Sequence, residues 1–273
     1  MRPAEFFEHW QRIAAQALYP NFRAFEIPVM VFNGTDTWLF GAAQVPAGFV
    51  RDGQWFSHRG KFHSLTANTA IDVAMVMESD PLEAAFIAAH EAFHVFQAQH
   101  FPHWGANEMT ALTYPTTDVQ QLLERRLETV ALYRAIEGMD AAWAVEALHW
   151  REQRHQRLSV DAVLYERELE RHEGLAFFVE LNARGIKHRL PEADFSAEDV
   201  RRRTSATGQA MARLLEGWQP DYAAAVEHGY LDQLLHEVVK NHQRKPLEPD
   251  LIAAQLECAV REVEQILVEK SRA

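Results

Sequence analysis

The apolar pattern of this chain changes at about residue 80, and that change restricts the folds open to it. From about Phe25 to Met77, short β-branched and aromatic runs alternate with Asn-Gly, Pro and Arg-Asp-Gly turn signals, a pattern typical of a small, mostly antiparallel sheet. From Asp80 onward, the apolar residues recur at helical spacing. The sequence therefore predicts an α+β fold with a sheet in residues 1–80 and a predominantly helical part in residues 81–273.

Helices are expected in one amphipathic segment at the start of the chain and in seven later segments. The ranges are 1–18, 81–100, 118–137, 140–157, 160–184, 197–217, 221–240 and 248–269. The connecting segments are short, and 273 residues with 48% hydrophobic content can bury a substantial core. We therefore expect a single domain, residues 1–273, made of a sheet-bearing subdomain (1–80) and a helical subdomain (81–273).

The helix expected at 81–100 has well-defined ends. Asp80 can cap its first turn, Pro81 suits its first position, and Glu83 would complete a capping box. Phe101 precedes a proline and marks its expected end.

The charge balance narrows the list of partners. The chain has 27 Lys and Arg against 39 Asp and Glu, a net charge of −12, which argues against nucleic acid and anionic lipid as partners. Cys258 is the single cysteine, so an internal disulfide and a thiolate zinc site are excluded. The first residues lack the pattern of a signal peptide, and no stretch reaches the roughly 20 apolar residues of a membrane span. We expect a cytoplasmic protein with no membrane partner, and the oligomeric state stays open.

The helix expected at 81–100 carries the motif His90-Glu91-Ala92-Phe93-His94. Residues i and i+4 share one helical face, so the two imidazoles can bind one metal ion. Glu91 lies about 100° around the helix, where its carboxylate can reach a metal-activated water as general base. Zinc suits this site because it takes imidazole and carboxylate ligands and lowers the pKa of its water to about 7. The alternative is a coincidental motif in a helical protein, since the chain has 14 histidines.

The motif and its uncharged neighbours resemble the active helix of the zincin metallopeptidases. The resemblance implies a zincin-like fold and a zinc-dependent metallopeptidase that hydrolyses a peptide or protein substrate. In that family the helix follows the edge strand of a small sheet, and the edge strand pairs with the extended substrate backbone. The run IDVAMVM at 71–77 stands where that strand would be. An ordinary core strand is an equally open interpretation of this run.

The third metal ligand must come from elsewhere in the chain, because two histidines alone make a poor zinc site. His100 stands where the metzincin pattern has its third histidine, but the glycine that turns the chain in that pattern is Gln97 here. On a helix that continues to His100, its side chain would point about 240° away from His94.

The segment 165–180 offers a better match, because it resembles the Glu-Gly-Leu-Ala helix of gluzincin-type proteins. The resemblance assigns the third ligand to Glu173, with Glu170 and Glu108 as substitutes, and Glu180 is expected to orient a ligand histidine. Gly174 and Ala176 would allow another helix to approach closely. Glu166 and Glu170 are expected in a solvated acidic stripe. The arginine clusters at 125–126 and 201–203 are expected on solvated helix faces.

A peptidase of this type also needs a donor to the oxyanion that forms during attack. The segment 226–230 resembles the region that supplies a tyrosine in some gluzincins, but Val226 occupies the tyrosine position. His228 and Tyr230 are the catalytic candidates that remain. The departure at Val226 keeps a second function open, a zincin-fold metal-binding protein without peptidase activity.

Overall fold

The computed structural model describes residues 2–43, 45–60, 73–190 and 196–272. The chain divides into two compact units, each described by itself. Unit 1 comprises Met1–His103 and Val179–Ile186, and unit 2 comprises Trp104–Phe178 and Lys187–Ala273. The described residues form a five-stranded mixed sheet and ten α-helices, which confirms the α+β class. The division places residues 81–103 with the sheet, whereas the sequence suggested a boundary at residue 80.

Unit 1 contains the sheet, in the strand order β3-β4-β2-β1-β5. The strands are β1 (Val29–Phe32), β2 (Thr37–Phe40), β3 (Val50–Asp52), β4 (Trp55–His58) and β5 (Ala74–Met77). Three pairings are antiparallel, as expected, and β5 runs parallel to β1. Within the described residues β5 is therefore an edge strand, while Ile71 and Asp72 of the predicted run lie outside them.

The helices of unit 1 pack through an aromatic core. They are α1 (Pro3–Ala14), the 3-10 turn η1 (Ala24–Glu26), α2 (Pro81–His100) and the Val179–Arg184 part of α6 (Leu175–Arg184). Phe93 of α2 lies between Tyr19 and Phe22, with ring centroids 4.9 and 5.2 Å away. This cluster packs α2, the helix that carries the His90–His94 motif, against the segment that contains Tyr19 and Phe22.

The ends of α2 agree with the sequence, but its capping box does not form. Asp80 accepts hydrogen bonds from the backbone N–H groups of Leu82 and Glu83 at 3.0 and 2.9 Å. The N–H of Asp80 donates to Glu78 instead of Glu83. The Glu83 carboxylate binds Arg184 at 2.8 and 3.0 Å, because a guanidinium is a stronger partner than a backbone amide.

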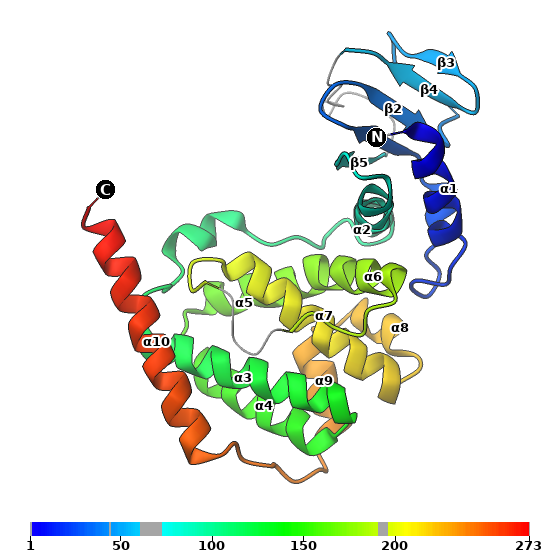
Figure 1. The fold of residues 1–273 in the computed structure, drawn as a ribbon. Helices are drawn as coiled ribbons and strands as arrows, with labels where there is room; N and C mark the ends of the chain where they lie inside the picture. The colour runs from blue at the N-terminus through cyan, green and yellow to red at the C-terminus, as the bar shows by residue number, and fades with distance from the viewer. Residues whose placement is uncertain (1, 44, 61–72, 191–195, 273) are drawn as a thin grey trace. The chain divides into compact units, whose positions relative to one another are not determined.

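Unit 2 is helical in its described part (Figure 1). Its elements are η2 (Glu108–Thr113), α3 (Val119–Gly138), α4 (Ala141–His155), α5 (Val160–Leu169), η3 (Glu170–Gly174), the start of α6, α7 (Val200–Trp218), α8 (Tyr222–Val226), α9 (Leu231–Val239) and α10 (Pro249–Lys270). Helices α3 and α4 run side by side, and α10 packs against α3. The single helix expected at 221–240 is wrong, since a turn around Gly229 separates α8 from α9. None of the helices in the described part of the chain combines the length and hydropathy needed to cross a bilayer.

Residues 160–184 form one continuous helix, as predicted, but with a π-helical turn at η3. The boundary between the two units falls inside this helix, after Phe178. Helix α7 packs on η3 through two glycines, as the small residues near Glu173 suggested. A Cβ atom at Gly174 would lie 2.7 Å from Gly208 Cα, and one at Gly208 would lie 2.5 Å from the Glu170 carbonyl oxygen. Only glycine permits this approach at either position.

The interior of unit 2 contains a network of six charged side chains, defined as Arg125, Glu128, Arg151, Arg154, Glu166 and Glu170, each at most 3% exposed. Their ion pairs join α3, α4, α5 and η3. Burial alone would raise the pKa of Glu128, but the charges of Arg151 and Arg154 outweigh it and lower the pKa to about 2. The solvated positions expected for Glu166, Glu170 and Arg125 are therefore wrong, because each has a buried partner of opposite charge.

Candidate metal centre

The two motif histidines face each other on α2. The Nε2 atoms of His90 and His94 are 3.1 Å apart, and the ring centroids are 4.8 Å apart. Both side chains are partly buried, next to Ala89 and Phe93, which are fully buried. The prediction that this spacing brings two imidazoles together is confirmed.

The other ring nitrogen of each histidine has a partner of its own. His94 Nδ1 lies 2.8 Å from the Gln97 side-chain oxygen, and His90 Nδ1 lies 3.2 Å from Glu180 Oε2. An amide oxygen only accepts hydrogen bonds, so His94 Nδ1 carries a proton and donates it to Gln97. The Glu180 carboxylate beside His90 favours a proton on Nδ1 of that ring as well. A neutral imidazole protonated at Nδ1 has a lone pair at Nε2. With the proton on Nδ1 of both rings, the two Nε2 atoms present lone pairs 3.1 Å apart, an arrangement that a bound cation or a shared proton stabilises.

Glu180 belongs to a chain of charged groups that fixes His90. Its Oε1 accepts a hydrogen bond from Arg184 Nε at 2.9 Å, and Arg184 also binds Glu83. Burial alone would raise the pKa of Glu180, but the contact with the ring N–H of His90 and the charge of Arg184 lower it. Glu180 is thus an ionised acceptor beside His90, in the position expected for a residue that orients a ligand histidine.

Gln97 is a site residue that the sequence did not single out. In the sequence it stands where the metzincin pattern has a glycine. Its side chain is 1% exposed, and its oxygen accepts a hydrogen bond from His94 Nδ1. The signal was its spacing, since a residue three positions after His94 lies on the same helical face.

Glu91 is half-buried on the turn of α2 that carries His90. His100 is the last residue of α2 and is exposed, and its Nδ1 lies 2.9 Å from the Phe96 carbonyl oxygen. Because α2 continues through Gln97 without a turn, His100 does not follow the metzincin pattern.

Glu173, the predicted third ligand, lies in η3 within unit 2 and is 9% exposed. Its Oε1 accepts a hydrogen bond from Arg201 Nη2 at 2.6 Å, and His172 Nδ1 lies 3.4 Å from the same oxygen. π-Helical turns occur often at functional sites, and their extra residue rotates the side chains that follow. This rotation separates Glu173 from Glu166 and Glu170, which face the charged network.

The two substitutes for Glu173 are engaged elsewhere. Glu170 binds Arg151 at 2.7 Å and accepts a hydrogen bond from the Thr207 hydroxyl at 2.9 Å. Glu108 is half exposed and binds Arg201 Nη1 at 2.5 Å. Glu108 therefore belongs to the surroundings of Glu173 rather than to a separate site.

The two candidate oxyanion donors also lie in unit 2. Tyr230 precedes α9, and its hydroxyl donates a hydrogen bond to Glu168 at 2.9 Å. Burial and this carboxylate raise the pKa of Tyr230, so its proton is held by Glu168. His228 is exposed in the turn after α8. Val226, at the family's tyrosine position, is fully buried in α8.

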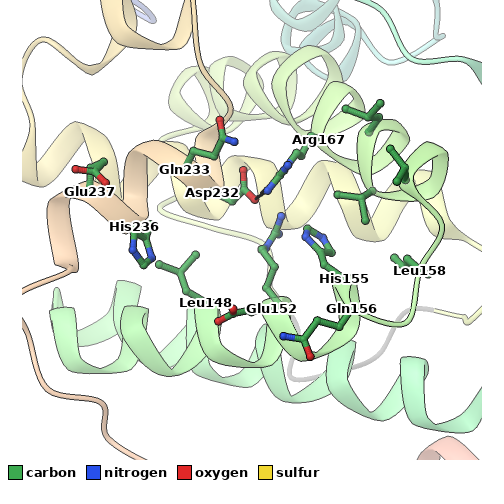
Figure 2. A pocket seen from close by; sticks show the side chains of 14 residues that line it. Leu148, Glu152, His155, Gln156, Leu158, Arg167, Asp232, Gln233, His236 and Glu237 are labelled. Atoms are coloured by element: carbon green, nitrogen blue, oxygen red, sulfur yellow. Dashed lines mark hydrogen bonds and ion pairs between the residues drawn. The ribbon is translucent and has the colours of Figure 1, made fainter.

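Unit 2 also has a cavity of about 810 Å³ among residues of α4, α5 and α9 (Figure 2). Arg167 and Asp232 point toward each other there, with both Arg167 Nε and Nη2 at 2.9 Å from Asp232 Oδ2. The predicted metal ligands are not among the residues that line it, which are Leu148, Arg151, Glu152, His155, Gln156, Leu158, Val160, Val163, Leu164, Arg167, Asp232, Gln233, His236 and Glu237.

Comparisons of this chain with protein-family models, with curated proteins and with solved structures found no match. The residues of the candidate centre are therefore the basis on which a function can be proposed.

Proposed function

We propose that this protein is a zinc-dependent metallopeptidase of the gluzincin type, with a zincin-like catalytic fold. His90, His94 and Glu173 would bind the zinc ion, and Glu91 would act as general base. The observation that supports the proposal most is the pair of Nε2 atoms 3.1 Å apart, each on a ring whose Nδ1 faces an acceptor.

The spacing of the two nitrogens suits zinc. Two ligands at Zn–N distances of about 2.0–2.1 Å in a tetrahedral site are about 3.3 Å apart, close to the 3.1 Å between His90 Nε2 and His94 Nε2. The chemistry of the donor set agrees, since two imidazoles and a carboxylate are a set that could hold a metal ion. A structural zinc site closes all four positions with protein ligands, whereas three protein ligands leave room for water.

The assignment of Glu173 is supported by the course of the helix from Val160 to Arg184. Within unit 1, Glu83 binds Arg184 and His90 lies beside Glu180, so α2 and the end of α6 run antiparallel. Glu173 precedes Glu180 by seven residues on the same continuous helix, and residues seven apart share a helical face. Glu173 therefore belongs to the face of this helix that carries Glu180, the carboxylate beside His90.

Each residue of the centre has a defined task in this proposal. Bound zinc would supply an activated water and polarise the carbonyl of a peptide or protein substrate. Glu91 accepts a proton from the attacking water and passes it to the leaving amine as the peptide bond breaks. Gln97 and Glu180 hold the two imidazoles in the tautomer that presents Nε2 to the metal.

The test compares the wild type with Glu91→Gln. We expect both proteins to contain about one zinc ion per chain by mass spectrometry, because Glu91 is not a ligand. In a peptide-library digest, the variant should be about 10²- to 10⁴-fold slower, the usual contribution of general acid–base catalysis. A wild-type protein without zinc would contradict the metal site, and equal cleavage by the two proteins would contradict the role of Glu91.

A second function is favoured by one observation, the burial of Val226 where a gluzincin has its tyrosine. In this alternative the protein binds zinc through the same residues but does not cleave peptides, and the metal centre has a structural or binding role. The same digest separates the two functions. Zinc at about one ion per chain without any cleavage that depends on Glu91 would favour the binding protein.

A further inference from the structure

We propose that Arg201 is a positioning residue that holds Glu173 in the orientation needed for metal binding. This inference rests on the proposed function, because it gives Glu173 the role of third ligand. It starts from the two ion pairs of Arg201, one through Nη2 to Glu173 Oε1 at 2.6 Å and one through Nη1 to Glu108 Oε1 at 2.5 Å. One guanidinium thus bridges two carboxylates from different elements, η2 and η3.

The bridge is anchored in the core of unit 2. Glu108 Oε2 accepts a hydrogen bond from the Tyr165 hydroxyl at 3.2 Å. Tyr165 is 3% exposed and packs in an apolar cluster with Tyr114, Leu169 and Val200. A chain of hydrogen bonds and ion pairs therefore connects a core side chain to the carboxylate of the predicted ligand. It runs from Tyr165 through Glu108 and Arg201 to Glu173.

The backbone contact between α7 and η3 sets the position of Arg201. Arg201 precedes Gly208 by seven residues on α7, so both lie on the same helical face. Gly208 touches the backbone of η3 at Glu170 and Gly174. The face of α7 that contacts η3 is therefore the face that carries Arg201. Because the glycine contact fixes α7 against η3, the backbone of Arg201 is held at a set distance from Glu173.

A positioning role is needed because Glu173 has three rotatable side-chain bonds and lies in a π-helical turn. A metal-binding carboxylate is usually held by a further hydrogen-bond donor, and loss of that donor typically lowers metal affinity about 10- to 100-fold. Arginine suits the task better than lysine, because its two Nη groups reach two carboxylates at once, whereas an ammonium is a single point charge.

The experiment measures zinc affinity by competition with a chromogenic chelator for the wild-type chain and for four variants. Arg201→Ala removes the bridge and is expected to weaken zinc binding about 10- to 100-fold. Arg201→Lys keeps the charge and should recover part of the loss. Glu108→Ala removes the anchor without touching Glu173 and should give a smaller loss. Arg202→Ala, which removes the same charge from the neighbouring exposed position, is the matched control and should bind zinc like the wild type.

Urea unfolding of the zinc-free proteins separates positioning from folding. The side chain of Arg201 is 53% exposed, so we expect the zinc-free Arg201→Ala and Arg202→Ala variants to unfold at similar urea concentrations. If the wild type binds zinc and Arg201→Ala binds it as tightly as Arg202→Ala, the positioning role is overturned and the proposed function stands. If the wild type binds no zinc, both are overturned.

Discussion

The charged network of unit 2 and the histidine pair of unit 1 are both polar groups within helical surroundings, but they are satisfied in different ways. In the network, three arginines face three glutamates, and every charge has an opposite partner inside the unit. In the pair, each histidine has a partner at Nδ1, and the two Nε2 atoms face one another. A buried cluster with balanced charges stabilises the fold, whereas two ring nitrogens that face one another are the arrangement expected of a pair of metal ligands.

The largest expected effect tests the structural side of the comparison. Arg154 is fully buried between Glu128 and Glu166, so Arg154→Met would leave two buried carboxylates with less compensation. We expect a loss of about 3–5 kcal/mol in the free energy of unfolding, measured with urea. Arg261→Met, at an exposed position of α10, is the control and should change stability by less than about 0.5 kcal/mol. Equal stability of the two variants would show that the network does not stabilise the fold.

The second prediction compares two glutamates of one helix, of which one belongs to the charged network and the other is the predicted metal ligand. Glu170 and Glu173 are three residues apart, but Glu170 faces the network and Glu173 faces Arg201. We expect Glu173→Gln to lower zinc affinity more than about 100-fold, since loss of a ligand exceeds the loss of a supporting contact. Glu170→Gln should lower the free energy of unfolding and leave zinc affinity near that of the wild type. The reverse pattern in chelator competition would assign the third ligand to Glu170.

The smallest expected effect concerns Gln97, the hydrogen-bond acceptor of His94. Gln97→Leu replaces the acceptor of the His94 Nδ1 proton with an apolar side chain of similar size, so we expect zinc affinity to fall about 10- to 100-fold. Gln97→Glu keeps an acceptor oxygen, as Glu180 provides for His90, and should retain most of the affinity. A loss of the same size in both variants would mean that packing at this position, and not the acceptor, determines zinc binding.

The elements predicted best are those whose signals are local. Asp80 and Pro81 start α2, and Phe101 before Pro102 ends it, because capping and the restriction before proline act within a few residues. The helix expected at 221–240 was wrong because its two halves keep a common apolar spacing, and that spacing hides the turn at Gly229.

The local part of the candidate site was predictable from the sequence, and the contacts with distant segments were not. His90 and His94 meet because their spacing alone places them on one face, and Glu180 lies beside His90 as expected. The burial of Glu166 and Glu170 was not predictable from their own segment, since their arginine partners come from α3 and α4. The apolar pattern of the sequence does not reveal the π-helical turn at Glu173. Only the structure therefore shows that Glu170 faces the charged network while Glu173 faces Arg201.

The contact between Gly174 and Gly208 has a consequence for any survey of substitutions in this protein. Neither residue has a side chain that can react or bind, yet a single methyl group at either one would force two helical backbones apart. In a saturation-mutagenesis library scored for the proposed peptidase activity, both positions should tolerate no replacement, as if they were catalytic residues. Loss of activity on substitution of these two glycines would show that the distance between η3 and α7, which carry Glu173 and Arg201, must stay unchanged.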